Sequence, residues 1–427
     1  MRKTKLFGWL LGIALCACMV LWMPLTADAA DSVETECAHG WVDGTCSACG
    51  EVCAHTSFDD NGFCAVCDFG QPAVDADGDG YVDIANAGNL YWLRYAVNIQ
   101  KNYSLNAELT ADIVINENAK VSEDPRTWKS IGGNNGFYSG IFDGNGYTIS
   151  GLYSNGSALF CDVKDGIIRN VGIIDCYIFT RTDSAAAIAD YISDTSRVEN
   201  CFCTGGEIRG KYEVGSIVAR CGGTVINCYN TSDVGGIYGG DACGGIVGEL
   251  YSGGSILNCY NTGKINAGAS TRFYGGIVGD IYMDAGKVDN CYYLNTTWGT
   301  GIGGADSAGK ADSMTAEQFA SGEVAYLLQS GVMGEDIYDD DWNYIETVTP
   351  QIWGQTIGKD AYPVIGGRQV YQITTCQNVL TYSNVNTTDG HIWIDGSCTA
   401  SNVCSICGTV DDKLGHTWMD ATCTQAK

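Results

Sequence analysis

Short apolar stretches, separated by Gly, Asn, Ser and Asp, recur through the middle of the chain. The clearest copies are Cys243–Gly248 (CGGIVG) and Tyr274–Gly279 (YGGIVG), with degenerate copies at Val214–Ala219, Ser184–Ala189 and Gly156–Phe160. Their central apolar residues are 29 to 31 residues apart, at Leu159, Ile188, Ile217, Ile246 and Ile277. A regular period of this length is typical of a stacked repeat architecture.

A second apolar stretch follows each of the first. Its copies are Val225–Thr231 (VINCYNT), Ile256–Thr262 (ILNCYNT) and the shorter Val288–Tyr292, Val198–Phe202 and Ile174–Tyr177. A third short piece, such as Lys264–Asn266, completes the unit. The stretches are rich in β-branched residues and too short for helices. One unit cannot bury its own apolar face, but stacked units share one core. The pattern therefore predicts an all-β fold, a right-handed parallel β-helix or β-solenoid.

Stacking places equivalent residues of successive units above one another. We expect an amide ladder along the stack, formed by Asn200, Asn227, Asn258 and Asn290. We also expect a column of small buried side chains, Cys201, Cys228, Cys259 and Cys291. In-register parallel stacking gives poor torsion for a disulfide, so buried thiols are favoured, with some bridges as the alternative.

The Gly-Gly-Ile-Val-Gly and Asn-Cys-Tyr-Asn-Thr-Gly segments together resemble the GLUG repeat. That repeat occurs in large bacterial surface proteins, including adhesins and the non-catalytic part of IgA-peptidase precursors. The segment Gly140–Leu152 (GIFDGNGYTISGL) is similar to the opening coil of such β-helices. The resemblance covers residues 130–298 and implies a right-handed β-helix with an adhesin-like surface role and no activity.

The segments on either side of the repeats read as caps. Residues 71–129 are expected to be a linker and N-terminal cap, with a helix over 89–97 and a strand over 109–115. Residues 299–375 are expected to form a C-terminal cap with one amphipathic helix over 314–328, begun by a capping box of Thr315 and Gln318. A strand is expected between Trp353 and Ile365, with its aromatics packing into the cap.

Cysteine and histidine gather in short units at residues 30–70 and 376–427, and all four histidines lie in them. The candidate metal ligands are Cys37, His39, Cys46 and Cys49; Cys53, His55, Cys64 and Cys67; His391, Cys398, Cys404 and Cys407; and an incomplete set of His416 and Cys423. One imidazole with three thiolates is the ligand set of a structural, zinc-ribbon-like zinc site. Disulfides are the alternative, since export favours them. The units resemble short Cys/His repeats of clostridial surface proteins.

An acidic segment between the Cys/His units and the N-terminal cap matches part of a calcium-binding loop. Asp75, Asp77, Asp79 and Asp83 stand at loop positions 1, 3, 5 and 9, with Gly80 at the sharp turn. Position 12 is Asn86 rather than a bidentate Glu. The segment is therefore a weak candidate for calcium, and an acidic linker turn is the alternative.

The N-terminus and the charge indicate an exported protein. Three basic residues precede an apolar run, and Ala27-Asp-Ala29 reads as a cleavage site, so residues 1–29 are expected to be a signal peptide. A lipid anchor on Cys16 or Cys18 is the alternative. No later stretch has the ~20 apolar residues of a membrane span. A net charge of −27 argues against nucleic acid and anionic lipid as partners.

No set of residues in the sequence converges on a catalytic mechanism, and the metalloprotease pattern His-Glu-x-x-His is missing from it. We therefore expect a non-enzymatic, secreted or surface-attached protein in an adhesion, display or stalk role. Its expected partner is a host or envelope protein or glycan surface. The alternatives are a β-helix polysaccharide lyase or hydrolase, or the stalk of a larger surface peptidase. The incomplete last Cys/His unit suggests that the sequence is a fragment.

Overall fold

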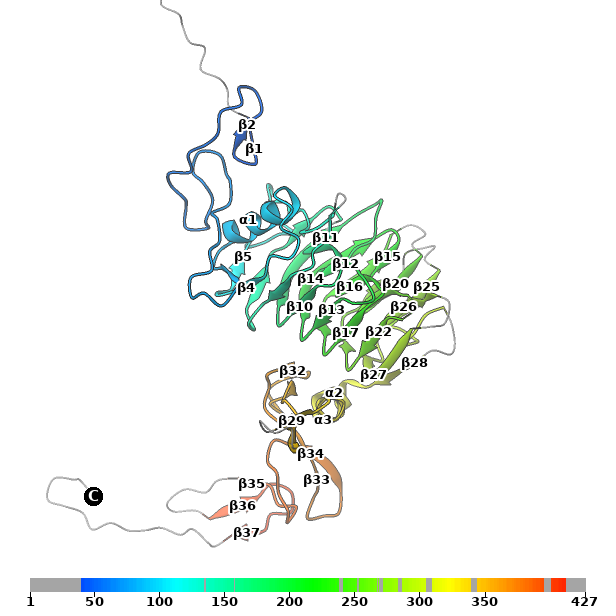
Figure 1. Cartoon of the computed structure of the whole chain (residues 1–427). Coiled ribbons are helices and arrows are strands. Elements are labelled where there is room, and N and C mark those ends of the chain that lie inside the picture. Colours follow the sequence, from blue (N-terminus) through cyan, green and yellow to red (C-terminus); the bar gives the residue numbers. More distant parts are fainter. Residues whose placement is uncertain are drawn as a thin grey trace, which may run out of the picture.

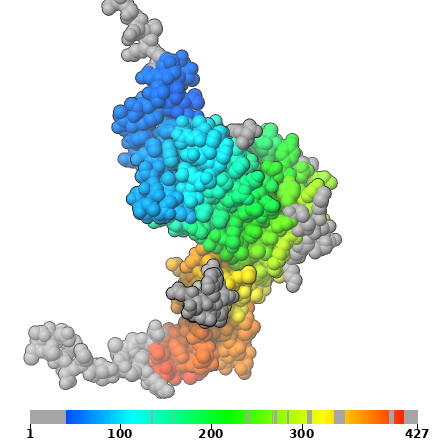
Figure 2. Space-filling view, viewed as in Figure 1, coloured from blue at the N-terminus to red at the C-terminus, as the bar shows by residue number. Residues whose placement is uncertain are grey.

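A computed structural model describes residues 40–133, 136–156, 158–237, 241–251, 253–266, 268, 272–282, 286–304, 309–338, 344–394 and 401–411. The described chain is a parallel β-solenoid of stacked coils with a small module at each end (Figure 1). In the space-filling view the N-terminal module lies against the first coils, and the C-terminal elements lie against the side of the solenoid (Figure 2). The predicted all-β parallel solenoid is confirmed.

The first face of the solenoid is a ladder of strands in parallel register. It runs in the order β3 (Val82–Ile84), β4 (Ala107–Leu109), β6 (Ile141–Asp143), β10 (Ile167–Arg169), β13 (Arg197–Glu199), β17 (Thr224–Ile226), β22 (Ser255–Leu257), β27 (Lys287–Leu294) and β28 (Gly309–Met314). The ladder therefore extends past the recognisable repeats at both ends, because an edge strand gains hydrogen bonds whatever its sequence.

The second face continues from the first after a sharp corner in each coil. Its strands are β5 (Ile113–Val114), β7 (Thr148–Ser150), β8 (Tyr153–Ser154), β11 (Gly172–Phe179), β14 (Phe202–Gly210), β18 (Tyr229–Asn230), β19 (Asp233–Gly236), β23 (Tyr260–Asn261) and β24 (Ile265–Asn266). All of their pairings are parallel.

The remaining side of the solenoid holds two smaller parallel sheets. One consists of β9 (Phe160–Val163), β12 (Ala189–Ile192), β16 (Val218–Cys221), β21 (Val247–Leu250) and β26 (Val278–Ile281). The other consists of β15 (Glu213–Val214), β20 (Ala242–Gly244) and β25 (Phe273–Gly275). In the three coils that contribute to both sheets, the strand of the three-stranded sheet precedes that of the five-stranded sheet, and a short turn joins them.

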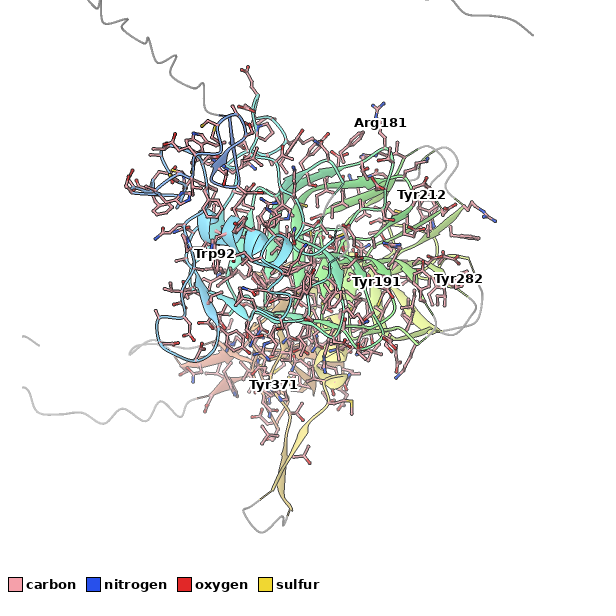
Figure 3. All side chains as sticks on the ribbon, turned by 45° about the horizontal axis from the view of Figure 1, so that its top comes forward. Trp92, Arg181, Tyr191, Tyr212, Tyr282 and Tyr371 are labelled. Carbon is pink, nitrogen blue, oxygen red and sulfur yellow. The ribbon has the colours of Figure 1, made fainter. Side chains whose placement is uncertain are left out.

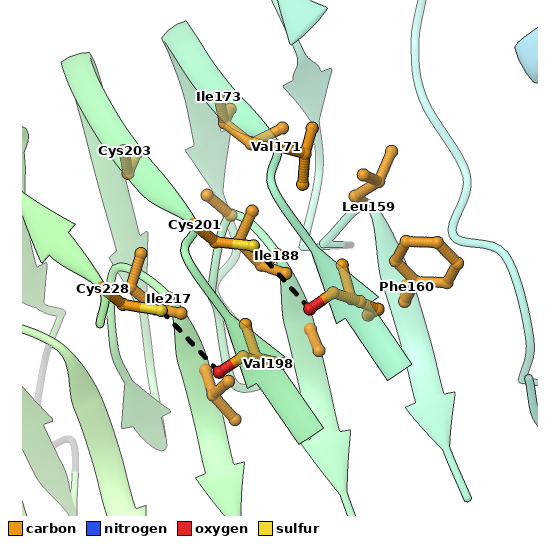
Figure 4. Close-up of a cluster of buried hydrophobic side chains, with 14 of the residues drawn as sticks. Leu159, Phe160, Val171, Ile173, Ile188, Val198, Cys201, Cys203, Ile217 and Cys228 are labelled. Carbon is orange, nitrogen blue, oxygen red and sulfur yellow. Dashed lines mark hydrogen bonds between the residues drawn. The ribbon is translucent and has the colours of Figure 1, made fainter. Parts of the chain in front are cut away.

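The repeat isoleucines form one column inside the solenoid. Leu159, Ile188, Ile217, Ile246 and Ile277 are each 0% exposed and belong to one apolar cluster. The peptide N–H of Ile217 donates to the carbonyl of Ile246 at 3.0 Å, and that of Ile246 donates to Ile277 at 2.9 Å. Figure 4 shows part of this column, with Ile188 and Ile217 in adjacent coils. The predicted stacking of like residues is confirmed.

The amide ladder runs along the corner between the first two faces. The Asn227 side chain donates to Asn200 at 3.1 Å, Asn258 donates to Asn227 at 2.6 Å, and Asn290 donates to Asn258 at 2.6 Å. The structure adds one rung that the sequence prediction lacked, since Asn200 donates to Asn170 at 3.0 Å.

The column of cysteines lies beside the amide ladder. Cys201, Cys228, Cys259 and Cys291 are buried, and each sulfur lies 3.1–3.2 Å from the carbonyl oxygen two residues earlier. None of the described cysteines of the solenoid forms a disulfide. The structure therefore contains the buried thiols that stacking predicted.

Helix α1 (Ala87–Asn98) packs at the N-terminal end of the apolar column. Asn86 caps it by accepting from the peptide N–H of Asn89, and Leu90, Leu93 and Val97 are fully buried. The predicted strand over 109–115 is instead divided into β4 and β5. Thr110 to Asp112 form the bend between them, because the chain turns from one face of the coil to the next there.

The C-terminal elements pack against the side of the last coils. The predicted single helix over 314–328 is two helices, α2 (Ala316–Ala320) and α3 (Glu323–Ser330). The break falls at Gly322, whose φ of 90° is incompatible with a continuous helix. The capping box of Thr315 and Gln318 is present as predicted.

Three hairpins accompany these helices. They are β29 (Glu335–Tyr338) with β30 (Tyr344–Val348), β31 (Trp353–Gly354) with β32 (Val364–Ile365), and β33 (Tyr371–Thr374) with β34 (Leu380–Ser383). Trp353 is buried against Tyr229, Tyr260 and Phe319. The expected packing of the aromatic residues of this segment into the cap is confirmed for Trp353.

Candidate metal centres

Two clusters of one histidine and three cysteines lie at opposite ends of the described chain. The N-terminal site consists of Cys53, His55, Cys64 and Cys67, whose ligand atoms all lie within 4.8 Å of one another. It follows a short hairpin of β1 (Trp41–Val42) and β2 (Thr45–Cys46). His55 has a φ of 48°, so its backbone turns sharply just where the imidazole enters the cluster. These are the four ligands that the sequence predicted for this unit.

The distances in the N-terminal site fit a tetrahedral ion. The sulfurs of Cys53 and Cys64 are 3.7 Å apart, and the Cys67 sulfur is 3.4 Å from His55 Nδ1. Ligands about 2.3 Å (sulfur) and about 2.05 Å (nitrogen) from a zinc ion would be about 3.8 Å and about 3.6 Å apart. A disulfide needs sulfurs about 2.05 Å apart. The arrangement therefore matches the edges of a coordination tetrahedron.

The C-terminal site has the same composition. Cys376, His391, Cys404 and Cys407 bring their ligand atoms within 4.8 Å of one another. The sulfurs of Cys376 and Cys404 are 4.0 Å apart, and the Cys407 sulfur is 3.5 Å from His391 Nδ1. The site joins the end of the β33–β34 hairpin to a small sheet of β35 (Trp393–Ile394), β36 (Asn402–Cys404) and β37 (Val410–Asp411).

Each Cys-x-x-Cys pair sits in the same tight turn. The carbonyl of the first cysteine accepts from the residue after the second cysteine, at 2.9 Å in all three cases: Gly50 to Cys46, Asp68 to Cys64 and Gly408 to Cys404. Those donors have φ of 77°, 59° and 73°, so glycine suits the position and Asp68 adopts it at some cost. The same turn is found at Cys46–Cys49, where Cys46 is buried and Cys49 exposed.

Each site contains at least one thiol whose pKa is lowered. Burial opposes ionisation of Cys64, but hydrogen bonds from the peptide N–H groups of Cys67 and Val66 and from His55 outweigh it and lower its pKa to about 6. In the C-terminal site, desolvation of Cys404 is likewise outweighed by the amides of Cys407 and Ile406 and by His391, and its pKa falls to about 6. A low thiol pKa favours metal binding, because the thiolate is the ligand.

Aromatic rings surround the ligands. Trp41, Phe58 and Phe69 pack against the buried cysteines of the N-terminal site, and the Phe69 ring lies 4.9 Å from the His55 ring. In the C-terminal site the Trp393 ring stacks on His391 at 5.0 Å. In the N-terminal module these rings and the cysteines form a small apolar cluster of their own, as expected for a module too small for a larger core.

The N-terminal module is fixed to the solenoid. Arg126 holds both carboxylate oxygens of Asp68, at 2.7 and 3.0 Å, and its guanidinium lies 3.7 Å above the Phe63 ring. A side chain on Gly88 of α1 would collide with the backbone of Gly62, so the module and the helix are in direct backbone contact. The position of this module therefore depends on α1 and on the first coils.

The C-terminal site differs from the prediction in one ligand. Cys376 stands where Cys398 was expected, and Cys398 lies outside the described residues. Cys376 is 15 residues before His391 in the sequence, so ligand spacing did not point to it. The available signal was that a cysteine also precedes the histidine in Cys53-x-His55. Cys37, His39, His416 and Cys423 likewise lie outside the described residues.

The acidic loop brings three of its four predicted ligands together. Carboxylate oxygens of Asp75, Asp77 and Asp79 lie within 4.8 Å of one another and are exposed. Asp75 accepts from the peptide N–H groups of Gly78 and Gly80. Asp83 accepts from Ala76 instead, and Asn86 is used as the cap of α1. The three grouped carboxylates could hold a cation, but the loop lacks the carboxylate at position 12.

Comparisons with known proteins assign no family. No family model and no curated protein matches the sequence. Among solved structures, a chain titled "IgA1 Protease" matches with a TM-score of 0.38 and 18% identity, over 52% of this chain and 16% of that one. No helix in the described part of the chain is long and apolar enough to cross a membrane. Fold and sites together define a parallel β-solenoid with a Cys3His cluster at either end.

Proposed function

We propose that this protein is a secreted, non-enzymatic rod that displays binding surfaces outside the cell, with structural zinc ions holding its terminal modules. The pair of Cys3His clusters at the two ends carries the proposal. The leader-like residues 1–29 and the resemblance of the coils to GLUG repeats support the extracellular role. The net charge of −27 suits a soluble exported surface.

The donor set favours zinc over other metals. Thiolate and imidazole ligands in a tetrahedron select zinc or iron–sulfur chemistry, whereas calcium and magnesium take oxygen ligands. Four protein ligands leave no position for water or substrate, so such an ion is structural and not catalytic. The same four ligands in each site explain how modules with so little apolar packing keep a defined fold.

The solenoid supplies the rigid part of the rod. Its interior is fixed by the isoleucine column and the amide ladder, while the turns and outward positions vary from coil to coil. Solenoids use this division to present extended binding faces without altering their core. A display role requires a rod that is exported, stiff and soluble. The leader-like residues 1–29, the continuous apolar core and the net charge of −27 support these three requirements in turn.

Metal analysis of the purified, exported protein tests the proposal. We expect at least two zinc ions per chain by inductively coupled plasma mass spectrometry. His55→Asn and His391→Asn should each remove one ion, and the double variant should remove two. Cys221→Ala, which deletes a buried thiol of β16 far from either site, should leave the count unchanged. Zinc-free protein with disulfides among these cysteines would contradict the proposal.

A further inference from the structure

One cleft in the solenoid contains buried polar atoms that the described residues leave unsatisfied. It has a volume of about 490 Å³ and lies beside β9, β12 and β16, with β15 forming another wall. Asp190 of β12 and Arg220 of β16 line it, together with Asp183, Tyr212 and Glu213. None of these residues belongs to either Cys3His site.

Asp190 is the most unusual residue in the cleft. It is only 8% exposed, and its Oδ2 accepts a long bond of 3.4 Å from the peptide N–H of Ala158. Its Oδ1 is buried and has no hydrogen-bond partner among the described residues. Burial raises the pKa of Asp190 well above its ordinary value. A buried carboxyl oxygen without a partner is costly to the fold, and a ligand that donates a hydrogen bond to it would remove that cost.

Arg220 offers the complementary atom from the next coil. Its Nε is buried and, within the described part of the chain, has no acceptor. The guanidinium lies 5.5 Å from the ring centre of Tyr191, which occupies the equivalent position in β12. Stacking on the ring holds the guanidinium without using its N–H groups. The cleft therefore presents an N–H donor and a carboxyl group from adjacent coils.

We propose that this cleft binds an uncharged oligosaccharide. A sugar hydroxyl donates and accepts at once, so neighbouring hydroxyls can satisfy both Asp190 Oδ1 and Arg220 Nε. Tyr212 at the rim is 38% exposed and offers a ring for the apolar face of a sugar (Figure 3). The carboxylates of Asp183 and Glu213 outnumber the one guanidinium among the lining residues and disfavour uronate or sialate ligands.

This inference rests on the proposed display role and gives it a ligand class. Isothermal titration of the full exported chain with uncharged β-gluco-, α-manno- and β-galacto-hexasaccharides tests it, with polygalacturonate as the anionic comparator. At least one uncharged ligand should bind saturably. Arg220→Gln should weaken that binding about tenfold, as expected for loss of a charged hydrogen bond. Tyr212→Ala, a rim substitution that leaves the core intact, should weaken it as well.

Arg197→Gln is the matched control, because Arg197 is an exposed arginine of β13 on another face of the solenoid. The Arg197→Gln variant should bind the sugar with the affinity of the unmodified chain. No binding of any uncharged hexasaccharide, tighter binding of polygalacturonate, or unchanged affinity in both Arg220→Gln and Tyr212→Ala would overturn the inference. Zinc content is measured on the same samples. Zinc-loaded, exported protein that binds no sugar would refute the ligand and leave the proposed function standing.

Discussion

Asparagine occupies the same corner in five successive coils because two demands coincide there. Asn170, Asn200, Asn227, Asn258 and Asn290 all have φ between 49° and 57°, a conformation that costs most residues about 1–2 kcal/mol and asparagine less. The same side chains link coil to coil through their amides. Glycine would meet the first demand alone.

Substitution of Asn258 separates the two demands. Asn258→Ala should lower the free energy of unfolding by about 3 kcal/mol, since it combines backbone strain with the loss of two buried amide bonds at about 1 kcal/mol each. Asn258→Gly should lower it by about 2 kcal/mol. Asn378→Ala, at an exposed turn with φ of 60°, is the control for strain alone and should cost about 1 kcal/mol. Urea unfolding measures all three, and a Gly variant as stable as the unmodified chain would contradict a stabilising ladder.

The buried thiols make the solenoid sensitive to alkali. Burial raises the pKa of both Cys221 and Cys243 to about 12, from 9.0. Below pH 9 these thiols are protonated in the folded and the unfolded chain, and their contribution to stability is fully present. Between pH 9 and about 12 only the unfolded chain releases the protons, so the free energy of unfolding should fall by about 1.4 kcal/mol per pH unit for each thiol.

Urea unfolding at pH 8, 9, 10 and 11 measures this fall. Cys221→Ala should show a shallower fall above pH 9, because it removes one of the titrating groups. Equal slopes in the variant and the unmodified chain would mean that Cys221 ionises alike in both states.

Among the elements, the tyrosines of the Asn-Cys-Tyr stretch connect the solenoid to its C-terminal cap. The rings of Phe202, Tyr229 and Tyr260 stack at 4.9 and 5.1 Å in successive coils. The ring of Trp353 in β31 packs against the rings of Tyr229 and Tyr260, with ring centroids 6.0 and 5.6 Å apart. The Tyr260 hydroxyl donates to the carbonyl of Pro363 at 2.6 Å. The outer side of the repeat is thus the docking surface for α2, α3 and β31–β32.

Removal of Trp353 should release this cap without unfolding the coils. Trp353→Ala deletes a fully buried ring and should destabilise the cap by about 3 kcal/mol or more. Hydrogen exchange should then accelerate in α2 and α3 and stay unchanged in β12 and β16. Tyr371→Ala, which truncates a partly exposed ring of β33, should alter neither. Faster exchange throughout the solenoid would show that cap and coils unfold as one unit.

The sequence predicted those elements whose residues repeat. Isoleucine, asparagine and cysteine columns follow directly from a period near 29, because stacking puts like residues together. The breaks at Thr110–Asp112 and Gly322 were not predicted, since apolar periodicity continues through both and only the turn of the coil or a positive φ interrupts the element. The local pattern of apolar residues does not indicate where the chain turns from one face of the coil to the next.

The sequence likewise predicted some residues of the candidate sites and missed others. The ligands within Cys53–Cys67 are close in sequence and were predicted, whereas Cys376 reaches its site from a separate hairpin. The cleft was missed because Asp190 and Arg220 stand at outward positions where the repeat is not kept. In the neighbouring coils Tyr191 stands at the position of Arg220, and Cys161 and Ala219 stand at the position of Asp190.

At the scale of the whole molecule, stability comes from two unlike sources. The solenoid is held by an apolar column continuous from α1 to the last coils. The terminal modules contain few apolar residues beyond the rings around their ligands, so we expect them to depend on metal. Arg126 and Asp68 join the N-terminal module to the rod, so loss of its metal should loosen this contact without reaching the column.

A zinc chelator should therefore unfold the ends of the molecule and spare its middle. Hydrogen exchange at the amides of Asp68 and Gly408 should accelerate about 100-fold or more, because their bonds to the cysteine carbonyls depend on the metal-held turn. The amides of Ile217 and Ile246, bonded between buried coils, should keep their protection. Added zinc should restore the protection of the Asp68 and Gly408 amides. Amides of Asp68 and Gly408 that stay protected in chelator would show that these turns fold without metal, and the structural role proposed for zinc would then fail.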